Sequence, residues 1–79
     1  MTLASEMKLE ELIGKKVRST RGFSGVPVGT VGKVVEKYGD KRHAGVMVEW
    51  KTTGGYSVRD GFGRDAEFDE TCWLDVLES

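Results

Sequence analysis

The chain has very few of the residues that build disulfides, metal sites or membrane anchors. Its 79 residues include one cysteine, one histidine and one proline. One cysteine excludes an internal disulfide, and Cys72 with His43 cannot supply the four ligands of a structural zinc within one chain. No apolar run approaches the ~20 residues of a membrane span, and no signal peptide is recognisable. We therefore expect a cytoplasmic protein with no metal, no cofactor and no membrane partner.

Sequence motifs of catalysis are also lacking. There is no Gly-x-Gly-x-x-Gly, no phosphate-binding Gly-x-x-x-x-Gly-Lys-Ser/Thr and no Gly-x-Ser-x-Gly. Acidic neighbours disfavour a thiolate at Cys72, which we expect to be a small hydrophobe, and His43 lies in a basic turn as an exposed imidazole. We therefore predict no catalytic residue and no enzyme activity.

Charge is distributed unevenly along the chain, although the formal net charge is only -1. Residues 1–14 carry a net -2, residues 15–59 a net +7, and residues 60–79, with Arg64 against seven acids, a net -6. The acids of residues 65–70 lack the spacing of a calcium-binding loop, so we interpret them as a solvated turn. This acidic end either covers the basic part of the same molecule or meets it on a neighbouring subunit.

The order of residue types predicts a short N-terminal helix followed by strands. Ser5 is a candidate N-cap, Leu9, Leu12 and Ile13 form an apolar stripe, and Gly14 ends the helix. A helix this short needs support from the rest of the protein or from another subunit. We assign residues 1–13 to this helix and residues 14–79 to one β domain.

Ten valines spread over residues 17–76 favour β-strands. Val46, Val48 and Trp50 should face inward and Met47, Glu49 and Lys51 the other way, while Gly32 suggests a bulge, or a bend where another backbone passes closely. Five short strands are too few for a sandwich and suit a small, strongly bent barrel. The predicted strands cover residues 16–19, 29–37, 46–51, 56–59 and 73–77, with a loop at 20–28, a turn at 38–42 and a glycine-rich exit at 60–64.

Over residues 14–78 this layout resembles the SH3-like small β-barrel class. The matching segments are Gly14-Lys15-Lys16-Val17-Arg18, Gly29-Thr30-Val31, Val46-Met47-Val48-Glu49-Trp50 before a Gly-Gly hairpin, and Trp73-Leu74-Asp75-Val76-Leu77. The resemblance implies a mainly β protein, a five-stranded SH3-like bent barrel with a short N-terminal helix. It implies the fold alone, because the Gly-Lys-Asn-Asp-Gly motif of CAP-Gly domains and the Val-Gln-Ile-Tyr motif of plasmid-borne dihydrofolate reductases are absent, as is the Arg-Gly-Pro-Asp-Trp opening of mind-bomb-type ubiquitin ligases.

Two sets of residues are candidates for binding. Ligand grooves of SH3-like barrels usually lie between the long first loop and the hairpin, so we expect exposed aromatics there, with Trp50 and Trp73 in the core. Aromatics beside cations would suit nucleic acid or an anionic peptide, although the pI of about 5.8 is low for a nucleic-acid-binding domain. The candidate aromatics are Phe23, Tyr38, Tyr56 and Phe62, and the candidate basic face is Lys16, Arg18, Arg21, Lys33, Lys41 and Arg42.

The sequence thus favours a non-enzymatic binding or assembly module whose partner is another protein or a second copy of the chain. The alternative hypothesis is a nucleic-acid-binding SH3-like domain that uses the basic face. A third hypothesis is an oligomeric enzyme whose site forms at a subunit interface.

Overall fold

The chain folds into a mainly β structure in which six antiparallel strands form one sheet beside a single short α-helix. The computed structural model describes residues 2–22, 26–40, 43–51, 55, 57–65 and 67–77. The elements are β1 (Thr2–Leu3), the 3-10 turn η1 (Ala4–Glu6), α1 (Leu9–Leu12), β2 (Lys16–Ser19), β3 (Val31–Gly39), β4 (Ala44–Lys51), β5 (Ser57–Arg64), the 3-10 turn η2 (Glu70–Trp73) and β6 (Leu74–Val76).

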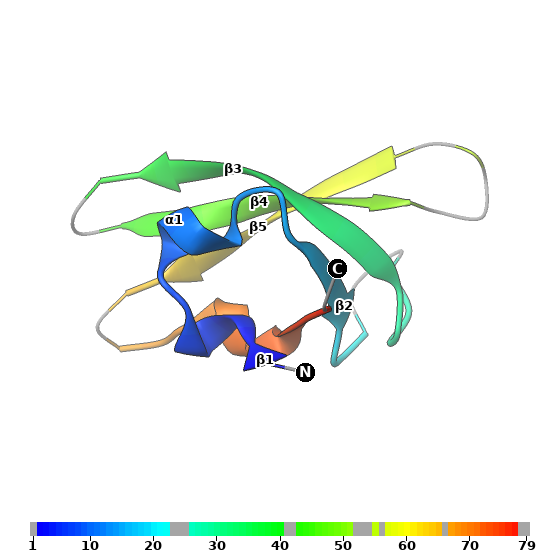
Figure 1. Cartoon of the computed structure of the whole chain (residues 1–79), viewed down its shortest axis with the longest axis horizontal. Coiled ribbons are helices and arrows are strands. Elements are labelled where there is room, and N and C mark those ends of the chain that lie inside the picture. The colour runs from blue at the N-terminus through cyan, green and yellow to red at the C-terminus, as the bar shows by residue number, and fades with distance from the viewer. Residues whose placement is uncertain are drawn as a thin grey trace.

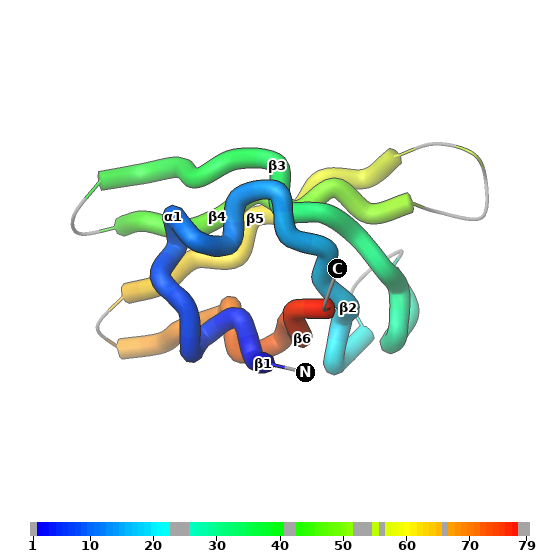
Figure 2. Tube along the Cα trace, viewed as in Figure 1, coloured from blue at the N-terminus to red at the C-terminus, as the bar shows by residue number. Residues whose placement is uncertain are grey.

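The strands lie in the order β1-β6-β2-β3-β4-β5. Figure 1 shows β3, β4 and β5 as an upper layer, with η2 and the short strands β1 and β6 beneath it, while α1 lies at the height of β4. In Figure 2 the tube of β3 begins beside β2 and then passes into the upper layer, so this one strand belongs to both parts of the sheet. The pairing of β1 with β6 brings the two ends of the chain together beneath that layer.

The sheet is open, and it has six strands where the sequence predicts five. Among the described residues no pairing joins β5 to β1, so the ladder does not close on itself. The additional strand is β1, whose Thr2 lies opposite Val76. A strand of two residues has no alternation that a sequence pattern could reveal, and it exists because β6 offers it a free edge.

The core lies between the two layers and is formed mainly by valines and one tryptophan. Val46, Val48 and Trp50 are fully buried, which confirms the inward face predicted for this strand. Trp73 is partly buried at the edge of the core. The buried hydrophobic residues are Ala4, Leu9, Leu12, Val17, Val26, Val34, Val46, Val48, Trp50, Phe62, Leu74 and Val76.

The prediction that Phe62 is exposed is wrong. The glycine-rich segment 60–64 continues β5 instead of leaving it, and Phe62 lies opposite Val46 on the inner face. Its ring meets that of Trp50 edge to face, with 6.0 Å between the centroids. The neighbouring Gly61 and Gly63 are on the outer face, where they leave the inward alternation intact.

Of the two alternatives predicted at Gly32, a bulge or a close backbone approach, strand β3 shows the second. A Cβ on Gly32 would lie 2.6 Å from Cε3 of Trp50 and 2.7 Å from the carbonyl oxygen of Glu49, which confirms the close approach. The bulge lies further along, between Val34 and Glu36, so that Val35 has no partner on β4. Bulges bend a strand and redirect a side chain, which is consistent with the passage of β3 between the two layers.

The N-terminal segment is helical over a shorter range than predicted. It divides into η1 and α1, and Lys8 rather than Ser5 precedes the helix. The carboxylate of Glu6 accepts the N–H of Leu3, and that of Glu11 accepts the N–H of Lys8, so each turn is closed by its own acid. Leu9 and Leu12 are buried, as their spacing predicts, whereas Ile13 is 48% exposed because the helix ends before it.

No helix in the described part of the chain is long and apolar enough to cross a membrane.

Candidate functional site

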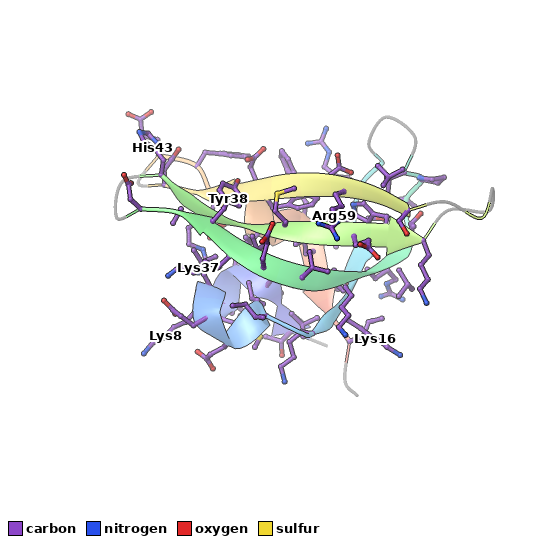
Figure 3. The ribbon with its side chains drawn as sticks, turned by 90° about the horizontal axis from the view of Figure 1, so that it is seen from above. Lys8, Lys16, Lys37, Tyr38, His43 and Arg59 are labelled. Atoms are coloured by element: carbon purple, nitrogen blue, oxygen red, sulfur yellow. The ribbon has the colours of Figure 1, made fainter. Side chains whose placement is uncertain are left out.

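A row of charged side chains crosses the outer face of the sheet. Lys16 on β2 lies opposite Lys33 on β3, Lys33 lies opposite Glu49 on β4, and Glu49 lies opposite Arg59 on β5. Figure 3 looks down on this side of the sheet and labels Arg59 near its middle and Lys16 toward one edge. Glu49 and Arg59 form an ion pair of 3.1 Å, so the negative charge in the row is already neutralised.

A shallow groove of about 210 Å³ lies between β2, β3 and β4. Its apolar surface comes from Val31, which is 46% exposed, and from Val35, the residue that the bulge leaves unpaired. Three lysines border it. We call this hollow the lysine groove; its lining residues are Lys16, Val31, Gly32, Lys33, Val35, Glu49 and Lys51.

The three lysines of the groove have no carboxylate partner among the residues that the structure describes. Four other basic side chains are paired: Arg18 with Asp75, Lys37 with Glu10, Arg59 with Glu49 and Arg64 with Asp69. Lys16 and Lys33 also face each other directly across two strands, an arrangement that costs stability because like charges repel. Positive charge is thus concentrated beside an apolar surface.

The predicted basic face is brought together only in part. Lys16 and Lys33 are neighbours in the lysine groove. Arg18 is paired with Asp75, and the guanidinium carbon of Arg21 lies 4.4 Å from the centre of the Trp73 ring. The two remaining members, Lys41 and Arg42, lie outside the described residues.

Of the predicted exposed aromatics, Tyr38 is the one that the structure describes at the surface. It is 36% exposed and lies in β3, which continues through the predicted turn as far as Gly39. Its side chain lies across Gly45 and Gly61, where a Cβ would meet the phenol oxygen at 2.5 Å and 3.3 Å. Burial, and secondarily the charge of Glu70, raises the pKa of Tyr38 above 10.0. Phe62 is buried, and Phe23 and Tyr56 lie outside the described residues.

The acidic turn near the C-terminal end is built by its own hydrogen bonds. Oδ1 of Asp65 accepts the N–H groups of Glu67 and Phe68, each at 2.8 Å, and these bonds lower the pKa of Asp65 below 3.8. The carboxylates of Asp69 and Glu70 are bound to Arg64 and to the N–H of Gly63. Asp65, Glu67 and Phe68 are exposed, and we call these three residues the Phe68 turn.

Two further residues considered in the sequence analysis, His43 and Cys72, are described by the structure. His43 is exposed and its backbone N–H donates to Asp40, while Cys72 is a half-buried free thiol. Within the ranges that the structure describes, no group of three or more His, Cys, Asp or Glu side chains is arranged to hold a metal ion.

Sequence reasoning missed Lys51, Val31 and Val35 as members of the site. Lys51 alternates with Trp50 on a strand whose outer face was assigned correctly, so the pattern that found the core could also have found this lysine. Val31 and Val35 share the alternation of Lys33, but valine in a strand is usually a core residue, so their outward position was missed.

No protein-family model, curated protein or solved structure matches this chain.

Proposed function

We propose that the protein is a non-enzymatic binding module that holds an acidic peptide segment in the lysine groove. The observation that carries this proposal is the presence of three lysines without carboxylate partners, in the described part of the chain, around an apolar surface. Carboxylates of the ligand would neutralise Lys16, Lys33 and Lys51, and an apolar side chain between them would cover Val31 and Val35.

The fold that we propose for this module is an SH3-like small barrel. The strand order β6-β2-β3-β4-β5 supports it: β2 to β5 follow one another in the sheet, and the last strand returns to lie beside β2. The bulged strand β3, shared by both parts of the sheet, and the 3-10 turn η2 directly before β6 also fit this class. The likeness is one of fold, and the function is argued from the groove.

The direct pairing of Lys16 with Lys33 is further support for a binding role. A cross-strand pair of like charges is destabilising, and an opposite charge at either position would remove the repulsion. Local conflicts of this kind are expected where a surface serves a ligand rather than the fold. An acidic ligand would relieve the repulsion when it binds.

An acidic peptide fits the groove better than nucleic acid does. Binding of single-stranded nucleic acid combines basic groups with aromatic rings on which bases stack. Among the residues that the structure describes, the lining of the lysine groove contains valines and no aromatic ring, and Trp50, beneath Gly32, is fully buried. Binding of nucleic acid is therefore treated as an alternative result of the experiment described next.

Fluorescence anisotropy with a labelled peptide, in which aspartates and glutamates flank one phenylalanine, tests the proposal. We expect Lys33→Glu and Lys51→Glu to weaken binding about tenfold or more, and about 0.5 M salt to weaken it as well. Lys8→Glu changes the net charge equally and serves as the control, because Lys8 lies on the α1 side of the molecule, away from Lys16 (Figure 3).

Two results would overturn the proposal. One is a peptide affinity that the groove variants do not change. The other is tighter binding of a thymine oligonucleotide than of the peptide, lost in the same groove variants, which would assign the groove to nucleic acid.

A further inference from the structure

We infer that the occupant of the lysine groove is the Phe68 turn of a second copy of this chain. This inference rests on the proposed function, since it names the partner of the same groove. Its consequence is self-association of the protein from head to tail.

The Phe68 turn has the chemistry that the groove requires. Phe68 is 52% exposed, and its ring lies 5.4 Å from the ring of Trp73, which supports it from behind. Asp65 and Glu67 flank it as exposed acids. The hydrogen bonds from the N–H groups of Glu67 and Phe68 to Asp65 hold the turn in shape, so little conformational entropy would be lost on binding.

The groove is large enough for this aromatic ring. A cavity of about 150 Å³ accommodates benzene in a protein interior, and the lysine groove measures about 210 Å³. A phenyl ring lying on Val31 and Val35 would bury their exposed apolar surface. The two acids of the turn would then lie among the ammonium groups at the rim.

The turn cannot reach the groove of its own molecule. The longest dimension of the molecule is 36 Å, and in Figure 1 the connection from β5 to η2 lies at one end of that axis, while β2 and the start of β3 lie toward the other. Among the described residues, one acid of residues 60–79 forms an ion pair with a cation of residues 15–59. It is Asp75, which pairs with Arg18. The acidic end therefore leaves the lysines uncovered.

Contact between two different surfaces has a defined effect on assembly. A groove and a turn at opposite ends form a heterologous contact, which each added copy can repeat, so the products are rings or open chains rather than a closed two-fold dimer. Because carboxylates and ammonium groups meet at its rim, the contact weakens as salt screens them.

Sedimentation velocity over a range of protein concentrations tests the inference. We expect the average mass of the wild-type protein to rise with concentration past that of a dimer, and to fall toward the monomer at about 0.5 M salt. Lys33→Glu and Phe68→Ser should each remain monomeric. Glu67→Lys, which leaves the Phe68 ring in place, should also weaken association, and Lys8→Glu should behave as wild type.

Mixing the two monomeric variants gives the sharpest test. Lys33→Glu keeps an intact turn and Phe68→Ser keeps an intact groove, so one productive contact can form between them. We expect a one-to-one dimer and nothing larger, with circular dichroism confirming that both variants are folded.

A wild-type protein that stays monomeric at all concentrations, or a mixture that stays monomeric, would overturn the inference. If the groove still binds the acidic peptide in that case, the proposed function stands and the partner is a different protein. If the peptide does not bind either, both proposals fail.

Discussion

The guanidinium of Arg64 donates a 2.9 Å hydrogen bond to the backbone carbonyl of Ala4, sixty residues earlier in the chain. The same side chain donates to the carbonyl of Met7 at 2.7 Å, to Thr71 at 2.8 Å and to Asp69 at 2.9 Å. One side chain at the end of β5 therefore connects the N-terminal segment with the turn that leads into β6.

Replacing Arg64 by methionine should destabilise the protein by about 2–4 kcal/mol, because hydrogen bonds of a charged group are lost and their acceptors are left without a donor. Arg64→Lys should recover only part of this, since one ammonium group cannot reach acceptors on both segments. Urea unfolding followed by circular dichroism measures the change. Arg59→Met is the control: its ion pair with Glu49 is exposed, and its loss should cost less than about 1 kcal/mol. Equal losses in the two methionine variants would contradict this account.

Gly32→Ala should destabilise the protein by about 2–3 kcal/mol. The new methyl group would overlap the ring of Trp50 and the carbonyl of Glu49, and both are held in place by the sheet. At Gly22 the nearest atoms to such a methyl, among the described residues, are 4.0 Å away, so Gly22→Ala should change the free energy of unfolding by less than about 0.5 kcal/mol. Denaturation midpoints of the two variants provide the comparison, and similar midpoints would show that the close approach has no energetic weight.

Phe62→Ala should cost about 3–5 kcal/mol, because it removes a buried ring from beside Trp50. For so small a domain that is a large part of the total stability. The matched control is Phe68→Ala, which removes an exposed ring and should cost about 1 kcal/mol or less. Thermal unfolding followed by tryptophan fluorescence separates the two, and a larger loss at Phe68 would contradict the assignment of Phe62 to the core.

Lys16→Glu should stabilise the fold while it weakens ligand binding. The substitution replaces a like-charge pair with an opposite-charge pair against Lys33, a gain of about 0.5–1 kcal/mol at low salt. The same change removes one of the three cations of the lysine groove. Chemical denaturation and peptide anisotropy on one preparation test both effects. A variant that loses stability would show that the two lysines do not repel each other in solution.

Lys37→Met should raise the pKa of Glu10 toward its ordinary value of 4.5. The ammonium group of Lys37 donates a 2.9 Å hydrogen bond to this carboxylate, and that bond is the main reason why its pKa is lowered. A lowered carboxyl pKa contributes stability above pH 4.5 that is lost as the pH falls through the folded-state value, so the variant should lose less stability in acid. NMR titration of the Glu10 carboxyl measures the pKa, with Lys33→Met as the control. An unchanged Glu10 titration would rule out the ion pair in solution.

The alternation of polar and apolar residues was sufficient to predict much of the sheet. It located β2 to the residue and assigned Val46, Val48 and Trp50 to the core, because a half-buried strand must alternate. It failed at residues 60–64, where Gly61 and Gly63 suggested a loop although they are outer-face positions of a strand. Glycine weakens a strand on average, yet here the side chain of Tyr38 lies over Gly45 and Gly61 and covers the exposed backbone.

The candidate site was predictable only in its charges. Lys16 and Lys33 were both assigned to the candidate basic face, and the structure brings them together because β2 and β3 pair in a register that sets them opposite each other. The sequence of one chain does not specify which residues of β2 and β3 lie opposite each other. Nor does it specify the bulge after Val34, which leaves Val35 unpaired on β4 and places it among the groove-lining residues.

The strand order also determines how the chain reaches this structure. β3, β4 and β5 pair with their neighbours in sequence, whereas Thr2 must find Val76, at the other end of the chain. Closing so long a loop costs more entropy than closing a hairpin, and contacts between distant residues slow folding. The three-stranded meander can therefore form first, and β6 and β1 complete the sheet afterwards. We therefore expect the pairing of Thr2 with Val76 to be among the last contacts that form during folding.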